Sequence, residues 1–383
     1  MPVLEAIFWI SAAVVLYTYA GYPALLVAAS RVRRKEIKKG SFEPKVSIIM
    51  SAFNEERFIE EKLINLLDLD YPAEKVEILV GSDGGSDETD QIVSKFHDPR
   101  IKFFRFIQNL GKPHVLNGLV NEASGSILVF TDARQRFDRA SVRNLVENFC
   151  DPEVGCVSGE LYFEETKGSG VAKGMDAYWK YEKFLRKKES EIGSMLGATG
   201  AIYAIQRRLF RPLPHDILVD DMFVPLAIVQ KGYRAVFDSS ATAFDQVSMK
   251  AGQEVKRKIR TLAGNYQIFA LFPDLFIPFK SPVAWQFISH KFLRLMVPFL
   301  LIGIFVVNLP LLTYPLYRSL FYLQLAFYGL AGFEHFAGKL FTGRRGIGYI
   351  PYMFCVLNYS AMMAFFRFLK KEDRKAAWEK AYV

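Results

Sequence analysis

The sequence predicts an α/β fold with a mostly parallel sheet, joined to α-helical transmembrane segments. Three apolar runs of strand length, Val46–Ser51, Ile78–Ser82 and Ile127–Phe130, support the sheet because a helical pattern follows each of them. Long apolar stretches near both ends of the chain support the membrane segments, since about 20 apolar residues suffice to cross a bilayer. We therefore expect a Rossmann-like domain attached to a membrane.

Composition and charge indicate what this protein contacts. The 383 residues are 51% hydrophobic and 23% charged, with a formal net charge of +9. The basic residues cluster beside apolar segments, which favours an anionic lipid surface over nucleic acid. Cys150, Cys156 and Cys355 form no metal-binding or disulfide pattern, so we interpret them as packing residues in a reducing compartment. We expect membrane lipids as partners and no nucleic acid.

The first apolar stretch, Ala6–Ala29, is longer than a signal-peptide core and is followed by a run of basic residues from Arg31 to Lys39. By the positive-inside rule this run stays in the cytoplasm, so we expect an integral protein of the cell (inner) membrane with its α/β domain in the cytoplasm. The predicted units are an N-terminal transmembrane helix (1–30), a basic linker (31–44), the α/β domain (45–250), amphipathic interfacial helices (251–291), C-terminal transmembrane segments (292–368) and a basic tail (369–383).

The C-terminal segments leave a topological conflict. Leu295–Leu312 and Tyr317–Phe333 are typical of a transmembrane hairpin, and Ile350–Phe366 is a third candidate. If all three cross the bilayer, the basic run that begins at Arg367 emerges outside, against the charge rule. Either that rule fails here, or one segment is re-entrant or interfacial. We take four spans in total as the nominal prediction.

Inside the α/β domain the strands alternate with helical patterns, as parallel sheets require. Two further strands are expected near Ile101–Phe106 and Gly155–Gly159. The predicted helices are Arg57–Leu67, Glu88–Lys95, Lys112–Ala123 and Arg139–Phe149. This alternation predicts that polar residues after neighbouring strands meet at one edge of the sheet.

Small, acidic and amide residues do follow three of the strands. Asn54, Asp83 and Asp132 each lie within three residues of the end of a predicted strand, where ligands of open α/β sheets bind. Such a set suits a nucleotide with a charged diphosphate, and a carboxylate at Asp83 can accept a hydrogen bond from the N3–H of uracil. The alternative is that Asp83 and Asp87 cap the helix that follows.

Later motifs continue the pattern in a recognisable order. They are the run Gly111–Asn117 with a Gly-Lys-x-x-x-Leu-Asn spacing, the pair Asp220-Asp221, the triplet Gly232-Tyr233-Arg234 and the basic run Lys256–Arg260. With the three strand ends, this order resembles the family 2 glycosyltransferases, over roughly residues 44–265. The resemblance is to their membrane-bound branch of cellulose, hyaluronan and poly-N-acetylglucosamine synthases, and it implies the GT-A fold.

The resemblance implies a nucleotide-sugar site. It carries the nucleotide contacts over to Ala52 (through its backbone), Asn54, Glu55 and Asp83. Lys112 stands at a helix start, where it pairs with phosphate or a buried carboxylate unless it is simply an exposed lysine. Arg260 matches the family arginine that contacts the diphosphate, and Arg257 takes the place of a glutamine. Thr261 replaces the tryptophan of processive members, and the same basic run also suits docking on lipid headgroups.

Asp132 occupies the first position of the family's Asp-x-Asp metal motif, while Arg134 replaces the second carboxylate. Two carboxylates normally hold a hard divalent ion that neutralises the departing diphosphate. Either Asp132 still binds Mg²⁺ or Mn²⁺ with waters and another ligand, or Arg134 supplies the positive charge directly. We favour a retained divalent metal.

The pair Asp220-Asp221 is implied to be catalytic. Inversion at an anomeric carbon needs a base opposite the leaving diphosphate, and the resemblance gives this role to Asp221, with Asp220 in place of the usual glutamate. The alternative for paired acids at a helix start is complementation of the helix dipole. The resemblance further implies that the small-residue loop of Gly197, Ala198, Thr199 and Gly200 lines an acceptor channel. Trp179 is expected either to stack on acceptor sugars or to contact the membrane.

The resemblance therefore implies an inverting hexosyltransferase of the cytoplasmic membrane face. The expected donor is a nucleotide-sugar, in particular a UDP-sugar, and the expected acceptor is a polysaccharide or a lipid-linked saccharide. Two other readings stay open at this point. One is a single-sugar transferase to a lipid carrier, and the other is a catalytically inactive scaffolding relative.

Overall fold

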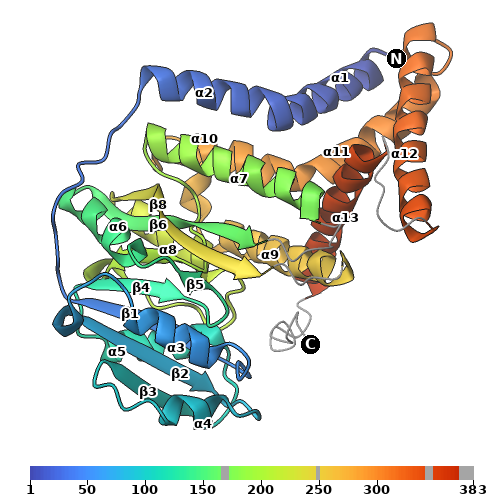
Figure 1. Cartoon of the computed structure of the whole chain (residues 1–383). Helices are drawn as coiled ribbons and strands as arrows, with labels where there is room; N and C mark the ends of the chain where they lie inside the picture. Colours follow the sequence, from blue (N-terminus) through green and yellow to red (C-terminus); the bar gives the residue numbers. More distant parts are fainter. Residues whose placement is uncertain (165–171, 247–250, 341–347, 371–383) are drawn as a thin grey trace.

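The computed structural model describes residues 1–164, 172–246, 251–340 and 348–370. It shows an α/β domain built on one mixed sheet, with the long apolar helices gathered on the side of that domain away from strand β3 (Figure 1). Within the described residues the sheet has eight strands. In spatial order they are β3 (Ile101–Phe106), β2 (Val76–Asp83), β1 (Val46–Ala52), β4 (Ile127–Thr131), β7 (Tyr203–Gln206), β6 (Val154–Glu164), β8 (Arg234–Gln246) and β5 (Arg136–Phe137).

The predicted parallel sheet is confirmed for β3, β2, β1 and β4, which pair in parallel. The sheet is mixed, because β7, for which no direction was predicted, runs antiparallel to both β4 and β6. Strand direction depends on how the chain returns to the sheet and not on local side-chain pattern, so the apolar run of β7 carried no sign of its reversal.

Helices cover both faces of the sheet, which explains why β1 and β2 are almost continuously apolar. Successive residues alternate between two cores. Ile49 and Leu79 pack in one cluster with Leu116 of α5, while Ile48 and Ile78 pack in the other with α3. Each of these side chains is essentially inaccessible, and burying one such chain contributes roughly 1.5–3 kcal/mol.

The helices of the α/β domain begin and end close to the predicted positions where a prediction was made. They are α3 (Ile59–Leu67), α4 (Thr89–Ser94), α5 (Lys112–Glu122), α6 (Ser141–Glu147), α7 (Ala172–Ile192), α8 (Asp220–Gln230) and α9 (Ala251–Leu271). The contact of α5 with β2 depends on Gly81, because a Cβ there would lie 2.4 Å from Val115 Cγ1. This close approach brings the start of α5 to the end of β2.

Three helical stretches of the described chain are long and apolar enough to cross a membrane: Pro2–Val32, Ala284–Leu311 and Tyr349–Lys370. The first joins α1 (Pro2–Leu16) to α2 (Tyr22–Val32) through a π-helical turn (Tyr17–Gly21). The second joins α10 (Ala284–Gln286), a π-helical turn (Phe287–Phe292) and α11 (Leu293–Asn308). The third is α13 (Tyr349–Lys370). Helix α12 (Pro315–Leu340), over the segment nominally predicted as a further span, is not in this set.

One end of each of these three stretches adjoins the α/β domain. After α2, the Lys35 N–H donates to the Glu191 carbonyl at 2.7 Å. Near the start of the second stretch, His290 Nδ1 lies 2.7 Å from Glu189 Oε1 of α7. At the end of α13, Phe368 stacks on Tyr266 of α9. If all three C-terminal segments crossed the bilayer, the last would end on the opposite side, whereas here its end lies beside the α/β domain. Of the predicted basic tail, residues 371–383 lie outside the described residues.

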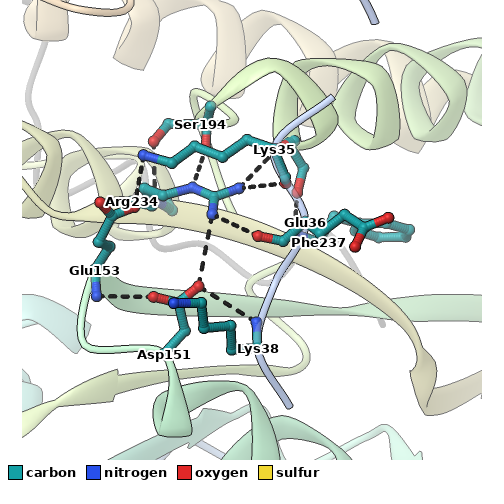
Figure 2. A network of polar contacts seen from close by, with 11 residues as sticks. Lys35, Glu36, Lys38, Asp151, Glu153, Ser194, Arg234 and Phe237 are labelled. Atoms are coloured by element: carbon teal, nitrogen blue, oxygen red, sulfur yellow. Dashed lines mark hydrogen bonds and ion pairs between the residues drawn. The ribbon is translucent and has the colours of Figure 1, made fainter. Parts of the chain in front are cut away.

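A buried arginine fastens the linker that follows the first membrane stretch (Figure 2). Arg234 is 5% exposed, and its guanidinium donates to the carbonyls of Glu36 at 3.2 Å and Lys35 at 3.0 Å. Its Nε donates to the Gly193 carbonyl at 2.9 Å, beyond the end of α7. The arginine of the Gly-Tyr-Arg triplet therefore ties the membrane linker to β8 and α7.

Candidate active site

The carboxyl ends of β1, β2 and β4 meet at one edge of the sheet, as predicted for parallel neighbours. The register pairs Ala52 with Ser82 and Met50 with Thr131, so the loops after these strands leave the sheet side by side. Together with α7, α8 and α9 they enclose a cavity of about 860 Å³. The predicted site residues that line this cavity are Asn54, Glu55, Asp83, Lys112, Asp132, Arg134, Trp179, Gly197, Ala198, Thr199, Gly200, Asp220, Asp221, Arg257 and Arg260.

Ala52 is the exception among the predicted residues. It is fully buried in the sheet and is not among the cavity-lining residues, whereas its neighbours Ser51 and Phe53 are. The reason is the two-residue period of a strand, which turns the Ala52 side chain into the core beneath the cavity.

The loops after β1 and β2 are held together by hydrogen bonds beside the cavity. Asn54 adopts a positive φ of 53°, and its Oδ1 accepts from the Ser86 N–H at 2.7 Å. The Glu55 N–H donates to Thr89 Oγ1 at 2.7 Å. Asp87 accepts from the N–H of Thr89 at the start of α4, so the alternative of a helix-start role is observed for Asp87.

Asp83 has a structural role that its position alone did not reveal. It is 2% exposed, and its two carboxylate oxygens accept the backbone N–H groups of Leu110 at 2.8 Å and Gly111 at 2.9 Å. Burial raises the pKa of this carboxyl, while these two hydrogen bonds oppose the shift. Asp83 thereby fixes the turn before α5, where Gly111 has a φ of 90° that favours glycine.

The turn places Lys112 at the centre of the acidic groups. Its Nζ lies 2.8 Å from Asp132 Oδ1 and 3.5 Å from Asp220 Oδ2. Burial lowers the pKa of Lys112, but the two carboxylates outweigh it, so the pKa lies above its ordinary value and the group is a permanent cation. Of the predicted roles, pairing with a buried carboxylate is the one the structure displays.

Arg134, at the second position of the metal motif, forms an ion pair with a carboxylate from another strand. Arg134 forms a close ion pair with Asp245 of β8, which is 3% exposed and also accepts from Gln135 Nε2 at 3.0 Å. Asp132 remains accessible, with 42% of its side chain exposed. No group of three His, Cys, Asp or Glu side chains placed to hold a metal occurs in the described part of the chain.

A second lysine, missed by the sequence analysis, lies behind the Asp132 loop. Lys62 of α3 is 3% exposed, and its ammonium donates to Thr131 Oγ1 at 2.8 Å and to the Gln135 carbonyl at 2.6 Å. Burial lowers its pKa to about 7, and Asp132 opposes this shift. The signal in the sequence was a lysine on the apolar face of α3, three residues after the buried Ile59.

Asp220 and Asp221 form the first turn of α8, at the wall opposite the Asp132 loop. The Asp221 carbonyl accepts from the Ala198 N–H at 2.8 Å, which docks the small-residue loop on this helix start. A Cβ on Gly200 would lie 3.2 Å from Asp221 Oδ2, so glycine leaves space beside this carboxylate. Burial, and then the neighbouring Asp220, raise the pKa of Asp221 to about 6, against an opposing effect of Lys112. Such a carboxylate accepts a proton more readily than an ordinary aspartate.

The wall formed by α7 and α9 carries aromatic and cationic side chains. Arg186, which the sequence analysis did not single out, donates to Thr199 Oγ1 and so connects α7 to the small-residue loop. The Arg257 guanidinium lies 5.6 Å from the ring centre of Trp179, and Lys258 Nζ lies 3.5 Å from that of Tyr178. Trp179, which was predicted to stack on acceptor sugars or to contact the membrane, thus makes a cation–π contact with Arg257.

The sequence of this chain is similar to known glycosyltransferases. Residues 47–213 match the family model described as Glycosyl transferase family 2. The poly-beta-1,6-N-acetyl-D-glucosamine synthase of Staphylococcus aureus is 24% identical over 286 residues, which cover 73% of this chain and 67% of that protein. The protein of the same name from Staphylococcus epidermidis is 22% identical over 275 residues, covering 70% of this chain and 64% of that protein.

Among solved structures, the mannosyltransferase PcManGT from Pyrobaculum calidifontis, in complex with GDP-Man and Mn²⁺, has the same fold. Its TM-score is 0.71 at 23% identity, with 97% of this chain and 100% of that chain covered. The alternation of strands and helices, the acidic cavity at the strand ends and these matches agree with one another. Residues 47–213 therefore carry a domain of the family 2 glycosyltransferases, and the chain is similar to the poly-beta-1,6-N-acetyl-D-glucosamine synthases.

Proposed function

We propose that this glycosyltransferase moves a sugar from a nucleotide-sugar to the hydroxyl of a saccharide acceptor, with inversion at the anomeric carbon. One observation carries the proposal: Asp83, Asp132 and Asp221 line a single cavity although they are far apart in the chain. The acceptor oxygen attacks the anomeric carbon, its proton passes to Asp221, and the bond to the nucleoside diphosphate breaks with the electron pair on the departing phosphate.

The cations of the cavity stabilise that departing group. Lys112 lies between the two acidic loops, and Arg257 and Arg260 of α9 line the same cavity. Negative charge grows on the diphosphate as the glycosidic bond breaks, so fixed positive groups bind the transition state more tightly than the ground state. Lys62 acts as a positioning residue, because from within the core it donates to the Thr131 hydroxyl and the Gln135 carbonyl, on either side of Asp132.

The residues present fit a divalent ion only if the diphosphate supplies ligands too. Asp132 offers one exposed carboxylate, and the second motif position is an arginine engaged with Asp245. Mg²⁺ is often held by one or two carboxylates together with substrate phosphates and water. Asp132 would hold such an ion, which would neutralise diphosphate charge. Mn²⁺ binding followed by electron paramagnetic resonance should then require a nucleoside diphosphate and should be lost in Asp132→Asn.

We also propose a donor class and a membrane face. Asn54 and Asp83 line the same cavity, and a carboxylate there suits uracil, so we propose that these loops bind the base and ribose of a UDP-sugar. The basic residues after α2 adjoin the α/β domain, and the positive-inside rule keeps such residues in the cytoplasm, so we propose that the domain faces the cytoplasm. The acceptor class is a polysaccharide, as in the names of the relatives, or a lipid-linked saccharide.

The test is release of nucleoside diphosphate by the purified full-length protein in lipid nanodiscs, with a panel of UDP- and GDP-sugars. Wild-type protein should release UDP from one of the UDP-sugars, and Asp221→Asn should release it at least about 100-fold more slowly. Binding of UDP should be retained in that variant. Equal release by both proteins would refute the role of Asp221, and no release from any donor would favour the inactive relative.

A further inference from the structure

The cavity does not end at the catalytic carboxylates but continues to the membrane helices. Its lining includes Tyr19 of the first candidate span, Leu295 of the second and Asn358 of the third. The same cavity therefore connects the base Asp221 with residues from three stretches that are long and apolar enough to cross a bilayer. An acceptor that reaches Asp221 by this route has to pass along membrane helices.

This end of the cavity is lined by more cations than anions. Its cationic side chains are Arg186 of α7, Lys258 of α9, and Lys291 and Arg294 at the start of the second candidate span. Its carboxylates are Glu182 and Glu189, both on α7. The excess of positive charge in a partly buried space favours an anionic ligand.

Contacts within the cluster show which charges are already balanced. Glu182 forms a close ion pair with Arg294, and its Oε2 lies 3.8 Å from Lys291 Nζ. Glu189 accepts from the Tyr22 hydroxyl at 2.7 Å and lies 2.7 Å from His290 Nδ1, so it is satisfied by the first and second candidate spans. His290 Nε2 also lies 3.3 Å from Glu182 Oε2, so Lys291 has the longest separation of the three basic side chains around Glu182, with 21% of its side chain exposed.

Aromatic rings also lie around the cations, in addition to the carboxylate of Glu182. Arg294 lies 5.6 Å from the ring centre of Tyr178 and 5.9 Å from that of Tyr19. Lys258 also lies against Tyr178, at 3.5 Å. Aromatic rings hold cationic groups in place without neutralising their charge, so these side chains keep their capacity to bind phosphate oxygens.

We propose that this membrane end of the cavity is a binding site for the phosphate-bearing headgroup of a lipid-linked saccharide acceptor. The inference rests on the proposed glycosyltransferase function and deepens it by naming the acceptor class. The phosphate groups lie among Arg186, Lys291 and Arg294, the lipid tail follows the membrane helices near Tyr19 and Asn358, and the acceptor hydroxyl reaches Asp221. Arg186 links the two ends, because it also donates to Thr199 of the small-residue loop.

The test measures binding, so it does not depend on turnover. The full-length protein in neutral-lipid nanodiscs, with UDP present to fill the donor side, is titrated with three probes. They are prenyl-diphosphate-linked N-acetylglucosamine, the neutral prenyl N-acetylglucosaminide, and N-acetylglucosamine 1-phosphate, which lacks a tail. The diphosphate-linked lipid should bind about tenfold or more tightly than either other probe, since charge-assisted hydrogen bonds and tail contacts are each lost in one of them.

Matched variants separate a headgroup site from a merely structural cluster. Lys291→Gln should remove most of the preference for the charged lipid, Lys291→Arg should keep it, and the exposed control Lys280→Gln should also keep it. Melting temperatures report whether each variant is folded, and Arg294→Lys provides a second probe of the same site. Equal affinity for charged and neutral lipids, or an unchanged preference in folded Lys291→Gln and Arg294→Lys, would overturn the inference. Equal binding of the tail-less phosphate would refute the lipid linkage. UDP release by the wild-type protein tests the proposed function separately.

Discussion

The position of the acid limb in the pH–rate profile is the sharpest test of the proposed base. Asp221 must be ionised to accept the acceptor proton, and burial together with Asp220 raises its pKa to about 6. Turnover should therefore rise with pH through about 6 and level off above it. Between pH 5 and pH 7 the ionised fraction grows from about a tenth to about nine-tenths, so the rate should increase about tenfold.

The perturbation that tests this reasoning is Asp220→Asn. Removing the neighbouring negative charge removes one cause of the raised pKa, so the limb should move to more acidic pH. The assay is UDP release at saturating donor and acceptor from pH 4.5 to pH 8, with UDP affinity measured in parallel. Asp221→Asn should lose the limb together with a factor of about 10²–10⁴ in rate. A limb that stays at the same pH in Asp220→Asn, or persists in Asp221→Asn, would refute the assignment.

Stability provides the control against misfolding. Because the folded pKa of Asp221 is raised, its contribution to stability is full below the ordinary value of 3.8 and is lost as pH rises through about 6. At pH 7 the ionised carboxylate thus opposes folding by up to about 3 kcal/mol before screening by solvent is allowed for. Asp221→Asn should melt at a higher temperature than the wild type at pH 7 while being inactive. A lower melting temperature would instead attribute the loss of activity to structural damage.

Three further predictions concern the scaffold around the site. Hydrogen bonds to the buried Glu77 outweigh the opposing effect of burial and lower its pKa to about 2, so Glu77→Gln should destabilise the fold by about 3 kcal/mol at pH 7. Denaturant unfolding at a series of pH values should show this loss of stability becoming smaller as the pH falls from 4.5 to 2. Gly81→Ala should cost about 1–3 kcal/mol, because its Cβ would lie 2.4 Å from Val115 Cγ1, and a thermal melt checks this. Lys62→Met removes the ammonium that donates to Thr131 and should lower kcat/KM for the donor about tenfold. Circular dichroism should show that the fold of this variant is unchanged.

Much of the fold could be predicted because its signals are local. The parallel strands β1, β2 and β4 are apolar runs followed by amphipathic helices, and both features are visible in a short window of sequence. The direction of β7 was not predictable in this way, since the pairing partners β4 and β6 are supplied by distant segments. The membrane stretches were recognised from composition, yet the second begins at Ala284, earlier than the predicted Leu295, because its π-helical turn carries His290 and Lys291 that lowered its apparent hydropathy.

The candidate site divides in a similar way. Asp83, Asp132 and Asp221 were named from motif spacing, and they do line one cavity. Lys62 and Arg186 were missed, because a single lysine or arginine in a helix carries no motif and gains its meaning only from what it contacts. The motif showed that Arg134 stands where the family has a metal-binding carboxylate. It did not reveal the ion pair with Asp245, which lies more than a hundred residues further along the chain.

By itself the sequence indicated the kind of chemistry, since residue type and spacing place carboxylates, glycines and a lysine at the ends of strands, where ligands of open α/β sheets bind. Only the tertiary structure decided how those groups are charged and connected. Packing of α3, α7 and α8 buries their polar side chains beside one another, and burial is what raises the pKa of Asp221 and lowers that of Lys62. Packing likewise joined the catalytic cavity to three membrane helices, a connection between segments that no local pattern records.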